Sequence, residues 1–269
     1  MTVIIFTAIA FLLYIYTAGM VGYRIFKLQQ STASIKVRII SIAGVALLAH
    51  GLVLIQSIFT SAGINLGFYH ALSLMSWVVA LLVIIVTMLK PVETLFLGFL
   101  PLIALAMLTE QLFPSSNILS TTTTIGLQFH IILSVTAYSL LTIAALQSIV
   151  LAIQEKQLRK KQPVKVMHIL PPLQTMEEIL VQLIAIGFFL LSLSLATGMM
   201  FVEDIFAQHI SHKTILSIVS WLVFGSLLWG RWSWGWRGKH LIRWTLSGFI
   251  ILVLAYFVPK FVYEILKGA

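Results

Sequence analysis

The sequence predicts an all-α fold: a polytopic membrane helix bundle of eight transmembrane helices, with both termini on the outer (periplasmic) side. Hydrophobic residues make up 60% of the 269 residues and charged residues only 9%, which is too apolar for a soluble domain of this length. Eight apolar runs approach or exceed the length of about 20 residues that a helix needs to cross roughly 30 Å of hydrocarbon. Most of the 17 Lys and Arg residues fall in alternate gaps between these runs, which gives the helices their predicted orientation.

The apolar runs predict a single integral membrane domain over residues 1–269, because no gap between them is long enough for a separate soluble domain. The predicted spans are residues 2–22, 39–62, 68–89, 94–113, 125–154, 179–202, 214–230 and 244–263. The first span has no basic residue before it and no small-residue cleavage site followed by a soluble domain. We therefore expect it to remain as a helix of the mature protein.

Prolines and acidic residues mark several ends of the later spans. Pro91 stands just before the fourth span, where proline costs least, whereas Pro101 lies deeper and should bend this helix. The pair Pro171–Pro172 closes the longest polar connection. Glu177 and Glu178 follow it, and we expect both carboxylates to begin the sixth helix at its positive end.

Positive charge gives the predicted orientation, because basic residues next to a span tend to stay in the cytoplasm. If the spans alternate in direction, all Lys and Arg residues except Lys213, Lys260 and Lys267 fall on one side. This sorting accounts for the net charge of +9, since the basic side faces an anionic inner leaflet. We therefore expect a multi-pass protein of the bacterial cytoplasmic (inner) membrane that has the lipid bilayer as its partner and binds no nucleic acid.

Several kinds of chemistry are excluded by residues that the sequence lacks. Without cysteine, the chain cannot form disulfides, thiolate metal sites, iron–sulfur clusters or the C-x-x-C-H attachment of c-type haem. It has no nucleotide-binding motif, no G-x-S-x-G or H-E-x-x-H sequence and no paired carboxylates within a span. We therefore expect no catalytic residues and no enzyme activity, and histidine remains as the strong metal ligand.

The predicted topology divides the seven histidines. His168 and His240 lie in basic cytoplasmic connections, where a solvated histidine is ordinary. The candidates for cofactor binding are the other five: His50, His70, His130, His209 and His212. The first of these lies near the middle of the membrane and the other four in its outer half.

His130 is the strongest of these candidates. It lies about five residues into its span, roughly 8 Å below the outer face. Ser134, Tyr138 and several small residues continue its helix face, and such a stripe can approach a flat ligand or a neighbouring helix.

His50 and His70 have ordinary structural alternatives. The face of His50 continues with Ala43, Ala46 and Val53, the pattern of a packed seam, so an interhelical hydrogen bond and a ligand role remain open for it. His70 begins its span at the outer surface and could belong to the interfacial belt.

Histidines from two helices suggest a cofactor. Two neutral imidazoles, one on each side of the iron, are a common way to hold haem b without cysteine. His130 and His212 are the predicted axial iron ligands, because one lies near the top of the fifth helix and the other at the mouth of the seventh.

Several short blocks in the second half of the chain resemble the cytochrome c assembly protein superfamily, and within it the HemX/YpjD-like branch of eight-span membrane proteins. The blocks are HIILSVTAY (130–138), LPPLQTME (170–177), HKTILSIVSW (212–221) and GWRGKHLIRWTLSGFIILVLAYFVPK (235–260). The first four spans share only their hydropathy with the family. The resemblance implies haem binding or haem handling at the outer face of the membrane with histidine ligands, and the family histidine before a short serine–tyrosine stretch corresponds to His130.

The chain also departs from this family. Members that deliver haem carry a tryptophan-rich W-G-x-x-W-x-W-D sequence in an outer loop, and at the corresponding place residues 201–213 read FVEDIFAQHISHK, without tryptophan. The run WGRWSWGW (229–236) is no substitute, because its spacing is one residue short, no Asp follows, and the basic residues around it predict the cytoplasmic side. We interpret it as an interfacial aromatic belt joined to a turn.

Three functions were compared on these grounds. The favoured one is a haem-binding or haem-handling membrane protein of the cytochrome c assembly type, without the tryptophan-rich presentation sequence. The alternative is a non-catalytic helper or regulatory subunit that binds another membrane protein, such as an ion transporter, or a tetrapyrrole-pathway enzyme. A transporter or channel is less favoured, because Glu110 is the one acidic residue expected inside a span.

Overall fold

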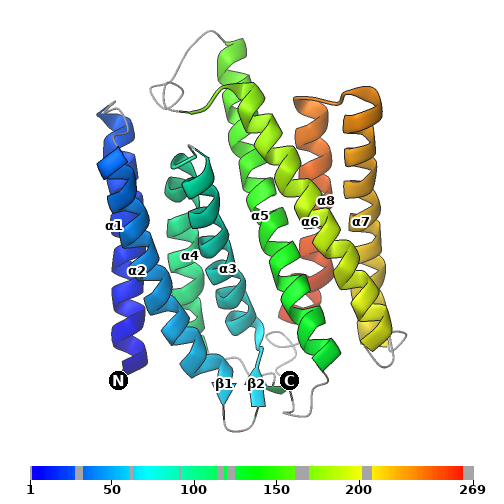
Figure 1. The fold of residues 1–269 in the computed structure, drawn as a ribbon. Helices are drawn as coiled ribbons and strands as arrows, with labels where there is room; N and C mark the ends of the chain where they lie inside the picture. The colour runs from blue at the N-terminus through cyan, green and yellow to red at the C-terminus, as the bar shows by residue number, and fades with distance from the viewer. Residues whose placement is uncertain are drawn as a thin grey trace. The chain divides into compact units, whose positions relative to one another are not determined.

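The structure is a computed structural model that describes residues 2–27, 33–60, 63–90, 92–113, 118–119, 125–160, 170–201 and 208–262. In this part of the chain it contains eight α-helices and three very short strands (Figure 1). The helices are α1 (Thr2–Phe26), α2 (Ala33–Ile58), α3 (Phe68–Leu89), α4 (Thr94–Leu112), α5 (Ile125–Arg159), α6 (Leu173–Phe201), α7 (Gln208–Trp234) and α8 (Lys239–Phe261). The strands are β1 (Phe59–Thr60), β2 (Gly63–Asn65) and β3 (Ile118–Leu119).

All eight helices are long and apolar enough to cross a membrane, which confirms the eight predicted spans. Several helices extend beyond the apolar runs; α5 continues to Arg159, and α7 continues to Trp234. Hydropathy marks only the part of a helix that lies in hydrocarbon, whereas backbone hydrogen bonding continues through the polar residues at its ends.

A small antiparallel sheet departs from the all-α prediction. The second span was predicted to reach residue 62, but α2 ends at Ile58 and the chain continues as β1, which pairs with β2. β2 also pairs with β3, so that Ile64 stands between Phe59 and Leu119. Gly63 has φ 135°, a conformation that favours glycine, where the chain returns from β1. Strands of two or three residues are too short to show an alternating pattern in the sequence.

The chain divides into two compact units. Unit 1 contains α1–α4 and the three strands, and unit 2 contains α5–α8. The single domain expected over residues 1–269 stays a prediction.

In unit 1 each helix packs against the next one, and α1 also packs against α4, so the four helices form a closed ring. Figure 1 shows β1 and β2 at the end of this unit where α1 begins and α2 ends. At its other end Arg24 of α1 and Glu93, just before α4, form a buried ion pair. Losing either partner would leave the other charge buried, so the pair holds these two helix ends together.

Unit 2 has the same order of packing: α5 on α6, α6 on α7, α7 on α8, and α8 back on α5. In this ring α5 and α7 lie on opposite sides. The turn between α7 and α8 contains Gly235 with φ 64° and Gly238 with φ 53°, which confirms the turn predicted after the tryptophan run.

The structure corrects the expected position of Glu177. α6 begins at Leu173 rather than near residue 179, so Glu177 lies beyond the first turn of this helix. Its Oε1 accepts a hydrogen bond of 2.7 Å from the backbone N–H of Gly238, the residue that precedes α8. The buried carboxylate therefore stabilises the positive end of α8, and its hydrogen bond links α6 to α8.

Candidate functional site

His130 of α5 packs against the C-terminal part of α6. Its Nδ1 lies 2.9 Å from the backbone oxygen of Ser194 and 3.4 Å from Oγ1 of Thr197. A carbonyl oxygen can only accept a hydrogen bond, so Nδ1 of His130 must carry the proton and donate it. The neutral imidazole in this form has its lone pair on Nε2.

Two serines surround this contact. Ser134 Oγ lies 2.6 Å from the backbone oxygen of His130, 2.7 Å from Oγ of Ser194, and 3.4 Å from Nε2 of His130. Because the carbonyl must accept, the hydroxyl proton of Ser134 is directed to it, and Ser194 donates to Ser134. The helical spacing predicts Ser134 on the face of His130, and the structure confirms that the two are in contact.

The end of unit 2 that carries His130 is less buried than its middle. The buried residues of α5 all lie between Ala137 and Gln154, and none lies between Ile125 and Thr136. Likewise, no residue of α7 from Lys213 to Val219 is buried. His130 itself is half-buried.

Aromatic side chains pack between the helices two turns further along α5 from His130. Tyr138, two turns after His130 on the same face, is buried, and its ring centroid lies 5.6 Å from that of Tyr256 in α8. Its hydroxyl also makes a hydrogen bond with Ser217 of α7. Three helices of unit 2 are thereby joined at the depth where the buried part of α5 begins.

His50 is fully buried in unit 1 and has partners on both ring nitrogens. Nε2 lies 3.0 Å from Oγ of Ser73, and Nδ1 lies 3.4 Å from the hydroxyl of Tyr14. The interhelical hydrogen bond considered for this residue is therefore present, while its role as a ligand stays a prediction.

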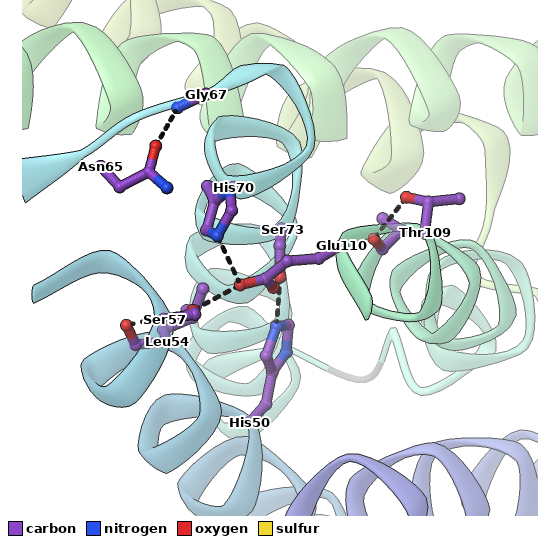
Figure 2. A network of polar contacts seen from close by, with 10 residues as sticks. His50, Leu54, Ser57, Asn65, Gly67, His70, Ser73, Thr109 and Glu110 are labelled. Carbon is purple, nitrogen blue, oxygen red and sulfur yellow. Dashed lines mark hydrogen bonds and ion pairs between the residues drawn. The ribbon is translucent and has the colours of Figure 1, made fainter. Parts of the chain in front are cut away.

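His70 lies close to Glu110 (Figure 2). Nε2 of His70 is 3.9 Å from Oε1 of Glu110, and the same oxygen accepts a 2.5 Å hydrogen bond from Ser57. In Figure 2 the side chains of α2, α3 and α4 converge here, and His50 and Ser73 lie beside them. The sequence had not connected Glu110 with any histidine.

The remaining histidine candidates are only partly described. His209 and His212 belong to the first residues of α7, and their side chains lie outside the described residues. His168, in the connection predicted to be cytoplasmic, also lies outside them. The structure thus places His130 and the backbone of His212 in unit 2, and His50 and His70 in unit 1.

The tryptophan run forms an ordered cluster at the turn between α7 and α8. Trp236 lies with its ring centroid 5.6 Å from that of Trp234 and 5.2 Å from that of Trp244. Its backbone oxygen accepts a hydrogen bond from Arg231. Trp232 and Trp234 are 86% and 68% exposed, as expected for side chains that face lipid headgroups.

Within the described ranges, no three His, Cys, Asp or Glu side chains are placed to share a metal ion. An iron held by a porphyrin needs only one or two protein ligands, so this does not bear on a haem site. The α6 partners of His130 were missed by the sequence analysis. The signal that could have found them is the spacing of Gly187, Leu191, Ser194 and Gly198, which places these residues on one face of α6.

Comparisons with known proteins extend the resemblance to most of the chain. Residues 38–267 match the family model for the cytochrome C assembly protein. The inner membrane protein YpjD of Escherichia coli (strain K12) is 33% identical over 248 residues, which cover 89% of this chain and 91% of that protein. The 28.8 kDa protein in the nifR3-like 5' region of Azospirillum brasilense is 36% identical over 146 residues, or 54% of each chain. No solved structure matches the chain.

Proposed function

The chain belongs to the cytochrome c assembly protein family, and from this premise we propose that it is a non-catalytic, haem-binding protein of the inner membrane. Membership of the family suggests haem handling in general. The finer proposal is that haem b is held near the outer face, with His130 and His212 as axial iron ligands. His50, His70 and His209 are secondary candidates for contact with the cofactor.

The observation that supports this proposal is the unequal use of the two ring nitrogens of His130. Histidines that bind metals almost always donate their other N–H to a carbonyl or carboxylate, which fixes the tautomer and the ring orientation. The contact of Nδ1 with the oxygen of Ser194 has this form and leaves Nε2 for a metal. Among the described residues, Nε2 of His130 has only the hydroxyl of Ser134 at 3.4 Å, and the proton of that hydroxyl is directed to a backbone oxygen. Nε2 of His50 lies 3.0 Å from the hydroxyl of Ser73, and its Nδ1 faces a hydroxyl rather than a carbonyl oxygen that fixes the proton, so His50 is less suited to the role.

The surroundings of His130 leave side chains that a large planar group could cover. A haem has apolar faces that must be covered by side chains, and the His130 end of unit 2 is where α5 leaves its side chains incompletely buried. His212 belongs to the start of α7, which follows the end of α6 in the chain and lies across the ring from α5. Helices on opposite sides of a ring can offer imidazoles to the two faces of one porphyrin.

Bound haem would supply an iron that can change its oxidation state. The chain would supply the two imidazoles, their orientation and the apolar surroundings. Delivery of haem to an apocytochrome is not part of the proposal, because residues 201–213 contain no tryptophan.

The visible spectrum of the purified protein, oxidised and reduced, tests the proposal. Six-coordinate, low-spin haem b is expected after expression with haem supply or after reconstitution. A protein that purifies without haem and cannot be reconstituted would rule out the haem site. The missing tryptophan-rich sequence would then favour the alternative of a helper subunit that binds another membrane protein or a tetrapyrrole-pathway enzyme, which co-purification from membranes would identify.

A further inference from the structure

Gly198 of α6 lies directly against the imidazole ring of His130. We propose that Gly198 is a positioning residue: its lack of a side chain lets α6 hold His130 as the Nδ1–H tautomer, with Nε2 as the ligating nitrogen. The part of this inference that concerns ligation rests on the proposed function, whereas the part that concerns the tautomer does not.

The space beside Gly198 is filled by the ring of His130. A Cβ atom added to Gly198 would lie 2.9 Å from Cε1 of His130 and 3.3 Å from Nδ1. Gly198 lies within α6, so its backbone has an ordinary helical conformation that any residue can adopt. The ring of His130 is therefore what requires glycine at this position, and a larger residue would push Nδ1 away from the oxygen of Ser194.

Two hydrogen-bond acceptors lie near Nδ1 of His130: the backbone oxygen of Ser194 and the hydroxyl of Thr197. The hydroxyl of Thr197 lies 2.9 Å from the oxygen of Leu193 and 3.0 Å from that of Ser194, and both are acceptors that take its proton. Thr197 therefore cannot donate to Nδ1 of His130, and it meets that nitrogen only as a weak acceptor at 3.4 Å. Both groups near Nδ1 accept, so both favour a proton on this nitrogen.

Nε2 is kept available by the two serines. The single proton of Ser134 is directed to the backbone oxygen of His130, and Ser134 accepts from Ser194. Ser134 then has no proton to donate to Nε2, which lies 3.4 Å away. The lone pair on Nε2 is therefore not used within the protein by these groups, and it can bind a metal.

The tautomer can be measured without haem. In haem-free protein labelled with 15N at histidine, the ring nitrogens of His130 are assigned by comparison with His130→Gln. We expect a signal from a protonated Nδ1 and an unprotonated Nε2. A protonated Nε2 in the wild-type protein would overturn the inference, whether or not the protein binds haem.

Gly198→Ala tests the role of the glycine, and Gly187→Ala is the matched control. A Cβ at Gly187 would lie 2.8 Å from Cδ2 of Leu141, so this change crowds the same pair of helices at a similar distance but away from His130. We expect Gly198→Ala to give a mixture of tautomers, and Gly187→Ala to keep the wild-type signal. Equal signals in the two variants and the wild type would overturn the positioning role.

Haem binding separates this inference from the proposed function. With haem, Gly198→Ala should lose at least about tenfold in affinity or become partly high-spin, whereas Gly187→Ala should keep the low-spin spectrum. If the tautomer is as expected but no variant binds haem, the positioning of the ring stands and the haem assignment is wrong. If haem binds but the tautomer is not as expected, the haem assignment stands and the positioning role of Gly198 is wrong.

Discussion

His50 and His130 both lie inside helices, yet their ring nitrogens meet different groups. The two nitrogens of His50 face the hydroxyls of Tyr14 and Ser73, which can each donate or accept, so either tautomer satisfies them. Nδ1 of His130 faces a carbonyl oxygen, which accepts only. One contact therefore specifies a proton position and the other does not. Both residues are histidines within helices, so the partner atoms make this difference.

The first prediction concerns single histidine side chains. Removing one of two axial imidazoles should convert six-coordinate, low-spin haem to a five-coordinate or weakly bound form. We expect His130→Ala to reduce haem content by at least about tenfold and His212→Ala to reduce it less, because His209 lies one turn away and can replace the lost ligand. The double variant should bind no haem, as judged by the Soret absorbance per protein.

His240→Ala is the control for these variants. His240 lies at the start of α8, beside Trp236. It therefore lies next to the turn between α7 and α8 and not at the end of the unit that carries His130. Its replacement should leave the spectrum unchanged. If the His130→Ala, His212→Ala double variant kept an unaltered low-spin spectrum, neither histidine would be an axial ligand.

The N-terminal end of α8 is stabilised by groups from other helices, and its own first turn carries no acidic residue. Glu177 of α6 accepts from the N–H of Gly238, which opens α8. The carboxylate of Glu155 in α5 is also close, since a Cβ at Gly238 would lie 3.5 Å from its Oε1. Two carboxylates from different helices thus meet at the positive end of α8, where negative charge is favourable.

A second prediction follows for α8. Glu177→Gln keeps the size of the side chain but weakens a charge-assisted hydrogen bond, and it should lower the free energy of unfolding by about 1–3 kcal/mol. Thermal unfolding in detergent measures the effect. Glu178→Gln is the control, because Glu178 is exposed on the same helix and should change stability by less than about 0.5 kcal/mol. Equal effects of the two changes would show that the bond to Gly238 contributes nothing.

The end of α7 supports a third prediction, about the tryptophan run. Trp232 and Trp234 are largely exposed, and phenylalanine preserves most of their apolar ring area at a lipid interface. The double change Trp232→Phe, Trp234→Phe should therefore leave haem content and the Soret band unchanged. Loss of the band with normal expression would mean that these indoles contact haem, contrary to their assignment to an interfacial belt.

At the scale of the whole molecule, two four-helix rings follow each other along the chain with the same order of packing. In the described part of the chain, eight helices are long and apolar enough to cross a membrane. The proposal that both termini are outside rests on the distribution of basic residues. If the helices alternate in direction, the His130 end of α5 faces outward and the tryptophan turn faces inward. The position of the haem site at the outer face depends on this orientation.

The fourth prediction tests the orientation with introduced cysteines, since the natural sequence has none to interfere. Cysteine at Ser116 or Gln208 should react with an impermeant thiol reagent in intact cells. Cysteine at Gln162, in the basic connection, should react only after the membrane is opened. Labelling of Gln162→Cys from outside would show that the topology is the reverse of the predicted one. The haem site would then have to face the cytoplasm.

The sequence by itself determined the number of helices, their approximate bounds and the family. The number and bounds of the helices depend on local composition: about 20 apolar residues in a row can satisfy their backbone in a membrane only as a helix, whatever the rest of the chain does. The family depends on short blocks of sequence in the second half of the chain. It also selected His130 and the serine on its face, because residues four apart share a helix face. The sheet escaped prediction because its strands have only two or three residues and because β2 pairs with β3 across a large separation in sequence.

Only the tertiary structure decided what each side chain meets. Ser194 lies 64 residues from His130 in the sequence, and Gly238 lies 61 residues from Glu177. Neither contact follows from a periodicity, because it depends on how far one helix is rotated and shifted against another. That rotation is set by the packing of small and large side chains along the whole interface. This packing brings Gly198 against the imidazole ring of His130, and it brings the backbone oxygen of Ser194 to Nδ1 of that ring.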